Sequence, residues 1–334
     1  MPNDASAGDA SIVPTRAVER IALSDAAATY ARAALAPATR RAYASHLRAW
    51  EAWCKARGAP PVPASPALVA NHLAELAGKH AHSTLTGRIA AIIRAHRLLG
   101  MAFEATHAGL RETLAGIARR HGTRPHRQAA PLLAAEMRRL AGVCGGDLRG
   151  ERDRALLLLG FAGAFRRVEL VGIDIADLRF QDWGLEVFLP RAKEDQDGRG
   201  RVVAIAAAPA VSGAVCPVAA VRSWLAVGGL SHGPLFRAIT RHGTLRAGRL
   251  SPETVRSVLK DRAWEAGWRG AALAGLSPHS LRAGCITALA LAQVHERDIM
   301  SHSRHSSQSV MRGYIRHAAG QPGIAAALWS RPEE

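Results

Sequence analysis

Apolar residues recur at helical spacing through the first third of the chain. From about Ala22 to Arg120 the sequence is rich in alanine, and the pattern is broken at Pro37, at the run of prolines between residues 60 and 63, and at Gly100. We therefore predict an all-helical domain over residues 22–120. Three of its helices are expected at about Ala38–Arg57, Pro66–Gly78 and Ser83–Leu99.

Residues 121–131, HGTRPHRQAAP, interrupt this pattern and predict an exposed basic linker. Beyond the linker, residues 132–334 predict a mainly α domain with a small β-sheet (α+β). Its two expected strands, Leu185–Leu189 and Arg201–Ile205, flank the polar hairpin tip KEDQDGRG. Its helices are expected at Glu136–Cys144, Arg152–Ala164, Pro217–Val227, Pro252–Ala266, His279–Gln293 and Ser309–Arg316, followed by a short apolar tail at Ile324–Trp329.

The charge balance indicates a polyanionic partner. The chain has 44 basic and 27 acidic residues, a formal net charge of +17, and both predicted domains are basic, as a clamp around a duplex would require. Only Lys55, Lys79, Lys193 and Lys260 are lysines, so arginine, whose planar fork grips phosphate oxygens in pairs, dominates. A GC-rich genome would give the same skew. A hydrophobic content of 48% excludes disorder throughout.

Nothing in the sequence predicts export or membrane insertion. Residues 1–21 lack an apolar segment and predict a mobile tail instead of a signal peptide. The uncharged run Val202–Val221 has the length of a membrane span, but prolines and a glycine break it, which favours a strand, a turn and a helix start. We expect a cytoplasmic, nucleoid-associated protein with reduced cysteines at positions Cys54, Cys144, Cys216 and Cys285.

Two charged patterns in the second domain are candidates for binding a phosphate. An apolar helix, LLLLGFAGAF, ends in Arg166, Arg167 and Glu169, which fits charges facing a cleft, although a helix end meeting solvent is the commoner explanation of so short a pattern. His279 and Arg282 form H-x-x-R on one helix face. About two such pairs are expected by chance in a chain of this composition, and a second one does occur in the linker, so spacing alone does not select this one.

Lys193 and Tyr314 are candidates for proton donation and nucleophilic attack. Lys193 lies at the base of the polar hairpin and, unlike arginine, can release a proton, although a solvated hairpin charge explains it equally well. Tyr314 is one of three tyrosines and has Arg312, Arg316 and His317 nearby, cations that would favour its phenolate. A tyrosine half-buried on a helix is the commoner alternative.

Taken in order, six positions resemble the catalytic signature of the tyrosine recombinase (phage integrase) family: Arg166, Lys193, His279, Arg282, His305 and Tyr314. The family pattern has an Arg-x-x-Glu-Leu box after an apolar helix, a lysine in a β-hairpin, His-x-Leu-Arg, and a His nine residues before the tyrosine. The resemblance extends over roughly Ala22–Ala318. Two positions depart from it. Val168 replaces the usual serine, and Ser-Arg-His replaces Gly-His at His305, with His302 as a second candidate one turn earlier.

The resemblance implies a mechanism without metal or cofactor. Tyr314 would form a 3′-phosphotyrosyl ester, Lys193 would protonate the 5′ oxygen, and Arg166 and Arg282 would brace the non-bridging oxygens. His279 and His305 would supply hydrogen bonds and proton transfer. Glu169 would orient the group.

The resemblance also implies the partners. Residues 22–120 would be a SAM-like core-binding domain and residues 132–334 the catalytic domain, closing as a clamp on double-stranded DNA with paired inverted sites and working as a tetramer at synapsis. The apolar tail would pack against a neighbour or cap its own domain. Candidate DNA-binding residues are Arg40, Arg41, Arg88, Arg124 and Arg127. Type IB topoisomerase-like DNA relaxation and a non-catalytic DNA-binding protein of this fold remain the alternatives.

Overall fold

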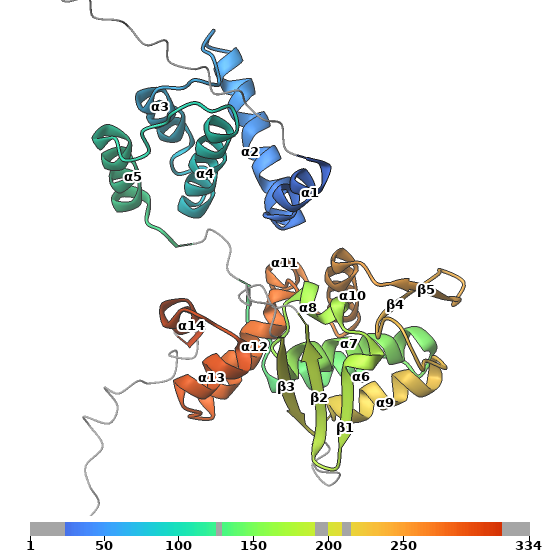
Figure 1. Ribbon diagram of the computed structural model, residues 1–334. Helices are drawn as coiled ribbons and strands as arrows, with labels where there is room; N and C mark the ends of the chain where they lie inside the picture. The colour runs from blue at the N-terminus through green and yellow to red at the C-terminus, as the bar shows by residue number, and fades with distance from the viewer. Residues whose placement is uncertain (1–23, 125–128, 191–199, 209–214, 316–334) are drawn as a thin grey trace, which may run out of the picture. The chain divides into compact units, whose positions relative to one another are not determined.

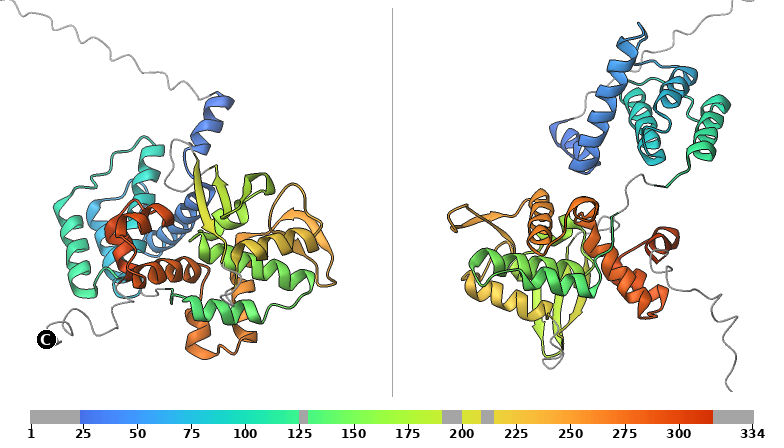
Figure 2. Two further views of the ribbon diagram at one scale, coloured as in Figure 1. Left: turned by 90° about the horizontal axis from the view of Figure 1, so that it is seen from below. Right: turned by 180° about the vertical axis from the view of Figure 1, so that it is seen from behind.

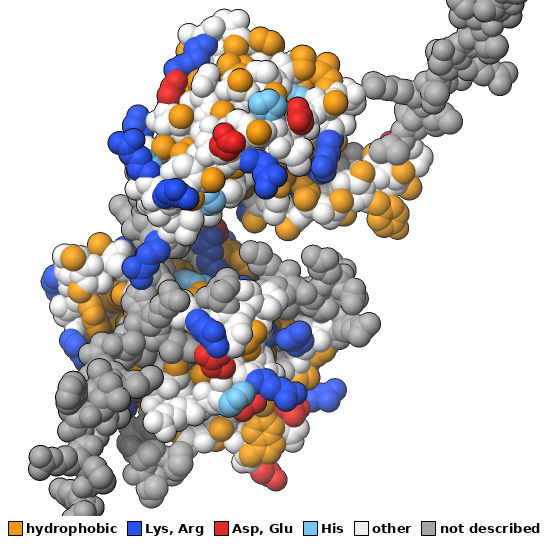
Figure 3. All heavy atoms as spheres, turned by 90° about the vertical axis from the view of Figure 1, so that its left-hand side faces the viewer, with side chains coloured by type: hydrophobic (Ala, Val, Ile, Leu, Met, Phe, Trp, Pro, Cys, Tyr) orange, Lys and Arg blue, Asp and Glu red, His pale blue; other side chains and the backbone are white. Residues whose placement is uncertain are grey.

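The computed structural model describes residues 24–124, 129–190, 200–208 and 215–315. The chain divides between His126 and Arg127 into two compact units, which Figure 1 shows as a helical unit and a mixed unit. Basic side chains lie scattered over both units on the face drawn in Figure 3, and acidic side chains are fewer there. No helix in the described residues is long and apolar enough to span a membrane.

Residues 24–124 of the first unit form five helices: α1 (Asp25–Ala33), α2 (Pro37–Lys55), α3 (Pro66–Leu76), α4 (His82–Leu98) and α5 (Ala108–His121). Three of them correspond to the predicted helices, whereas α1 and α5 were not predicted. Helices α2 and α3 begin with proline at the first helical position, where a missing N–H costs nothing. α2 packs on α4 and α3 packs on α5, around a core that includes Trp50, Leu73 and Ile92.

The second unit contains nine further helices among the described residues: α6 (Ala134–Gly142), α7 (Leu148–Ala162), α8 (Arg167–Gly172), α9 (Pro217–Val227), α10 (Pro252–Glu265), α11 (Gly270–Gly275), α12 (His279–Leu291), α13 (Glu296–Ser303) and α14 (Gln308–Ile315). Three of these, α8, α11 and α13, are short and were not predicted. The structure thus confirms a mainly helical chain with small antiparallel sheets.

A three-stranded antiparallel sheet lies beside the helices (Figures 1 and 2). Its order is β1 (Leu178–Gln181), β2 (Gly184–Leu189) and β3 (Arg201–Ala206). The predicted strands correspond to β2 and β3, which pair from Gly184↔Ala206 to Leu189↔Arg201. The predicted polar tip therefore connects these two strands. A second, two-stranded sheet, β4 (Arg237–Ile239) and β5 (Leu245–Arg249), was not predicted.

Helix α7 is the centre of the second unit. Its leucines at 156, 157 and 159 are fully buried in the main core. It also buries charge that ties it to two neighbours. Glu151 accepts from Ser223 Oγ of α9 at 2.7 Å, and Asp153 accepts from Arg262 of α10 at 2.8 Å. Because buried charges are tolerated only when paired, these contacts fix α9 and α10 around α7.

Candidate active site

Arg166 is placed by the turn between α7 and α8. Its backbone N–H donates to Glu169 Oε2 at 2.9 Å, and its Nη1 donates to Glu169 Oε1 at 2.7 Å, so the carboxylate caps the start of α8. Ala164 in the same turn has φ of 46°, a left-handed conformation that costs free energy for alanine. Its carbonyl accepts hydrogen bonds from two arginines described below.

Arg282 is the most deeply buried arginine of the site, with 1% of its surface exposed. It lies in the first turn of α12, and its Nη1 donates to the Ala164 carbonyl at 2.7 Å. α12 also packs closely against the chain at Leu132. Gly284 permits this contact, because a Cβ at position 284 would overlap the Leu132 carbonyl oxygen. The Leu132 N–H in turn donates to the Ser280 carbonyl at 3.2 Å.

Tyr314 lies on α14 and meets His279, the first residue of α12. The Tyr314 hydroxyl forms a hydrogen bond with His279 Nε2, and the ring centroids lie 5.6 Å apart. A small apolar cluster holds α14 in place: Met311 is fully buried against Ile286 of α12 and Ile299 of α13, and Tyr314 packs on its edge. The same helix therefore buries one face and presents the phenol at the other.

His305 contacts Tyr314 from a second direction, with ring centroids 5.5 Å apart. Arg282 Nη2 lies 3.2 Å from His305 Nε2, and Ser303 Oγ lies 2.8 Å from His305 Nδ1. The other candidate, His302, points away from this group: its Nε2 donates to the Ala162 carbonyl at 2.8 Å. The structure thus brings His305, and not His302, against Tyr314.

Arg304 is part of the site and was not singled out from the sequence. It is 3% exposed, and its guanidinium donates to the carbonyls of Gly163 at 3.1 Å and Ala164 at 3.0 Å and to Glu169 Oε2 at 3.0 Å. Its backbone has φ of 57°, which explains why glycine is usual at this position of the family pattern. Arg304 joins the turn that carries Arg166 to the turn that carries His305.

Burial and neighbouring guanidinium groups set the protonation states. Burial and the charges of Arg282 and Arg166 lower the pKa of His305 to about 3 and hold the pKa of His279 below its ordinary value. Both imidazoles are therefore neutral at pH 7. Burial raises the pKa of Glu169, but the Arg304 charge and hydrogen bonds from Arg166 outweigh it and keep the pKa low. The carboxylate is therefore ionised.

The expectation that neighbouring cations favour the Tyr314 phenolate is corrected by the structure. Burial raises the pKa of Tyr314, and the charges of Arg282 and Arg166 offset this only in part. Arg312, one of the cations proposed from the sequence, instead forms an ion pair with Glu296 at 3.1 Å. Arg316 and His317 lie outside the described residues. In the free protein Tyr314 is therefore a neutral phenol that needs a base.

The structure leaves some predicted residues unplaced. Lys193 and Arg127 lie outside the described residues. Arg40, Arg41 and Arg124 are exposed, and Arg88 is half-buried with its Nη1 3.4 Å from His72 Nε2.

Among the described residues no group of three His, Cys, Asp or Glu side chains could hold a metal ion. All four cysteines are free, and all but the half-buried Cys216 are buried.

A tyrosine hydroxyl beside two neutral imidazoles and two guanidinium groups is suited to phosphoryl transfer through a covalent tyrosine ester. Residues 131–321 match the phage integrase family. An integrase/recombinase xerD homolog from Selenomonas ruminantium is 36% identical over 281 residues, covering 83% of this chain and 81% of the relative. The chain therefore belongs to the phage integrase family of tyrosine recombinases.

Two solved structures have the same fold. The XerH site-specific recombinase, bound to a palindromic difH substrate, matches with a TM-score of 0.59 and 16% identity over 80% of this chain and 73% of that chain. The Tn1549 transposon integrase, in complex with transposon right end DNA, matches with a TM-score of 0.59 and 13% identity over 90% of this chain and 98% of that chain.

Family membership makes the protein a tyrosine-type site-specific DNA recombinase, and it favours this function over DNA relaxation of the type IB topoisomerase kind and over a non-catalytic DNA-binding role.

Proposed function

We propose that Arg166, Lys193, His279, Arg282, His305 and Tyr314 are the catalytic residues with which this protein cuts and rejoins duplex DNA at a specific site. The observation that carries the proposal is the contact between Tyr314 and His279. The phenol lies within hydrogen-bond reach of the neutral His279 imidazole. Arg282 contacts His305, whose ring packs against the Tyr314 ring. A nucleophile, a base and buried cations thus meet at one place.

In the proposed reaction the scissile phosphate binds against Arg166 and Arg282, whose guanidinium groups neutralise its non-bridging oxygens. The Tyr314 oxygen forms a bond to phosphorus while the bond from phosphorus to the 5′ oxygen breaks. The phenol proton passes to His279 Nε2, and the 5′ oxygen takes a proton from Lys193. Since one phosphodiester is exchanged for another, a 5′ hydroxyl from a second duplex reverses the step and joins the exchanged strand.

The two units have separate proposed roles. The helical unit would be a SAM-like core-binding domain that, with the catalytic unit, clamps DNA in which two inverted sites are paired, and Arg40, Arg41, Arg88, Arg124 and Arg127 would contact it. Exchange between two such sites needs four protomers, so the working form would be a homotetramer on DNA. Support for these roles comes from the net charge of +17 and from the recombinase relatives.

Trapping the covalent intermediate tests the proposal. The substrate is a duplex built on inverted repeats, to be identified beside the coding sequence, and nicked near the cleavage point. Its short 5′-hydroxyl fragment diffuses away once the strand is cleaved. We expect a protein–DNA adduct that survives denaturing electrophoresis.

Tyr314→Phe should abolish the adduct, whereas Tyr30→Phe, which alters an exposed tyrosine of α1, should leave it unchanged. An adduct that persists in Tyr314→Phe would contradict the assignment of the nucleophile.

A further inference from the structure

A hairpin on the second unit is unusually rich in arginine. The segment from Arg237 to Arg249, RAITRHGTLRAGR, contains four arginines and one histidine and no acidic residue. Strands β4 and β5 form its arms, and it projects from the body of the unit beside α10 (Figures 1 and 2). It shares no residue with the site at Tyr314.

The two arginines at the base of the hairpin have structural contacts. Arg237 donates to the carbonyls of Pro234, at 3.1 Å, and His232. Arg249 donates to the Val171 carbonyl at 2.7 Å and forms an ion pair with Asp174 at 2.7 Å. The contacts of Arg249 fasten the hairpin to α8 and to Asp174 after it, whereas those of Arg237 hold the turn that leads into β4. The base arginines are therefore accounted for by the fold.

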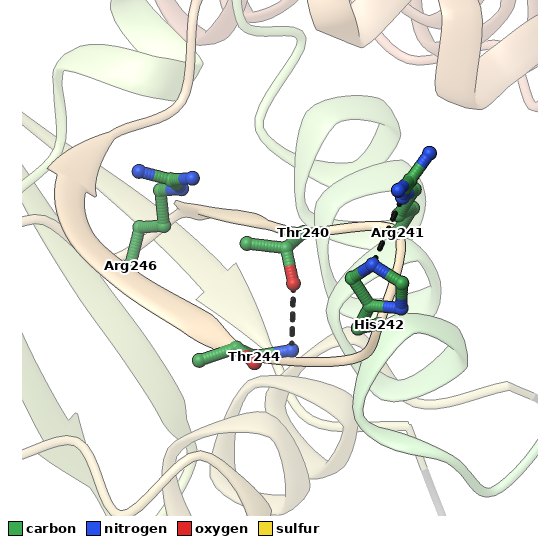
Figure 4. Close-up of a pocket in the computed structure, with 5 residues that line it drawn as sticks. All are labelled: Thr240, Arg241, His242, Thr244 and Arg246. Atoms are coloured by element: carbon green, nitrogen blue, oxygen red, sulfur yellow. Dashed lines mark hydrogen bonds between the residues drawn. The ribbon is translucent and has the colours of Figure 1, made fainter.

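The two arginines at the tip differ, because neither meets a carboxylate. Arg241 and Arg246 are exposed, and both extend to the same side of the hairpin in Figure 4. Arg241 Nε donates to His242 Nε2 at 2.9 Å, and Arg246 has no hydrogen bond or ion pair with any described residue. With Thr240 and Thr244 they line a hollow of about 630 Å³.

The tip that carries these arginines is held in a defined shape. The Thr244 N–H donates to Thr240 Oγ1 at 3.0 Å and closes the turn. Arg149 of α7 donates to the Thr240 carbonyl at 2.9 Å and anchors the tip to the body of the unit. Two like charges held on one side of an anchored hairpin match a group that has negative charge and several acceptor oxygens.

We propose that this hollow binds backbone phosphates of the duplex, at a position separate from the scissile phosphate. The inference rests on the proposed function, which makes duplex DNA the partner. Guanidinium groups bind phosphate oxygens through paired N–H donors, and contacts of this kind fix a protein on DNA without reading its sequence. The hairpin would thus extend the grip of the catalytic unit along the backbone.

The salt dependence of DNA binding tests the proposal. Affinity for a 40-bp mixed-sequence duplex is measured between 50 and 200 mM salt for the full chain and for Arg241→Gln/Arg246→Gln. Losing two phosphate contacts should reduce the slope of log K against log salt by about 1.8. The wild type should then lose about 12-fold more affinity over that range than the variant does. Arg241→Lys/Arg246→Lys should restore most of the slope, because a phosphate accepts either cation.

Two controls separate this proposal from general electrostatics and from the proposed function. Arg179→Gln/Arg222→Gln removes the same charge from two exposed arginines on β1 and α9 and should leave the slope nearly unchanged. Adduct formation on the nicked site, with protein saturating at low salt, should be retained in all variants. An equal loss of slope in both double variants, or an unchanged slope in the hairpin variant, would overturn the inference. The hairpin inference would then fail while the adduct still supported the proposed function.

Discussion

The ion pair between Arg304 and Glu169 gives a stability prediction whose magnitude follows from the structure. The two side chains are 3% and 5% exposed and lie 3.0 Å apart. Removing one partner of a buried pair costs roughly 3–5 kcal/mol, because the other charge stays buried. Glu169 retains Arg166 at 2.7 Å, so we expect the lower end, about 3 kcal/mol, for Arg304→Ala.

The backbone conformation at Arg304 changes which of two substitutions, to alanine or to glycine, destabilises the protein more. Its φ of 57° is left-handed, a conformation that costs about 1–2 kcal/mol for a residue with a Cβ. Glycine escapes that cost but loses about 0.5–1 kcal/mol to its greater freedom in the unfolded chain. Arg304→Gly should therefore be less destabilising than Arg304→Ala by about 0.5–1 kcal/mol, the difference between these two effects.

Urea unfolding followed by tryptophan fluorescence measures these differences, with one transition fitted for each unit. A double-mutant cycle with Glu169→Gln should give a coupling free energy of at least about 1 kcal/mol. Additive effects, or glycine proving worse than alanine at this position, would refute the reasoning. Adduct formation should also slow in Arg304→Ala, because the guanidinium that is removed holds Glu169, the partner of Arg166, and the Ala164 carbonyl in the turn before Arg166.

Three further predictions concern the site and its support. Since the pKa of His279 lies below 6.5, the second-order rate of adduct formation should be constant near neutrality and fall only below pH 6.5; an acid limb with its midpoint above 6.5 would contradict a neutral His279. Gly284→Ala should destabilise the second unit by roughly 1–3 kcal/mol or more in urea unfolding, while Gly142→Ala, whose new Cβ meets open space, should not. The Lys193→Ala variant should fail to cleave an ordinary nicked duplex but should cleave one with sulfur at the 5′ bridging position, because a thiolate leaves without a proton. Adduct yield measures both reactions, and failure on both substrates would argue against Lys193 as the acid.

Most helices with a clear start signal were predictable from the sequence, whereas α5 was missed despite its 14 residues. Helices α3, α9 and α10 begin with proline at the first helical position, so the sequence marks their starts. By contrast, β4 has only three residues and β5 is exposed at four of its five positions, so neither strand shows an alternating apolar pattern. Long-range contacts such as Arg249 with Asp174 hold these strands in place.

The sequence supplied the chemistry of the site but not its charge state. The arginines, histidines and tyrosine of the site could be predicted because the family pattern consists of residue types in a fixed order and spacing, which can be read from the sequence. The pKa of Tyr314 depends on burial, which spacing does not report, so the cations were given too much weight. The role of Arg304 depends on Glu169, 135 positions earlier. The one available signal was a charged residue standing where the family pattern has glycine.

The low pKa values of the two histidines have a consequence for when Tyr314 can react. In the free protein, burial and then the guanidinium groups of Arg282 and Arg166 lower the pKa values of His279 and His305, and burial keeps Tyr314 neutral. A phosphate bound among these groups brings negative charge to the same place and offsets that repulsion. The pKa of His279 should then rise, so the imidazole becomes a stronger base for the phenol proton only when DNA is in place. Binding and activation of the nucleophile are thereby coupled through charge, and the free enzyme keeps an unreactive phenol.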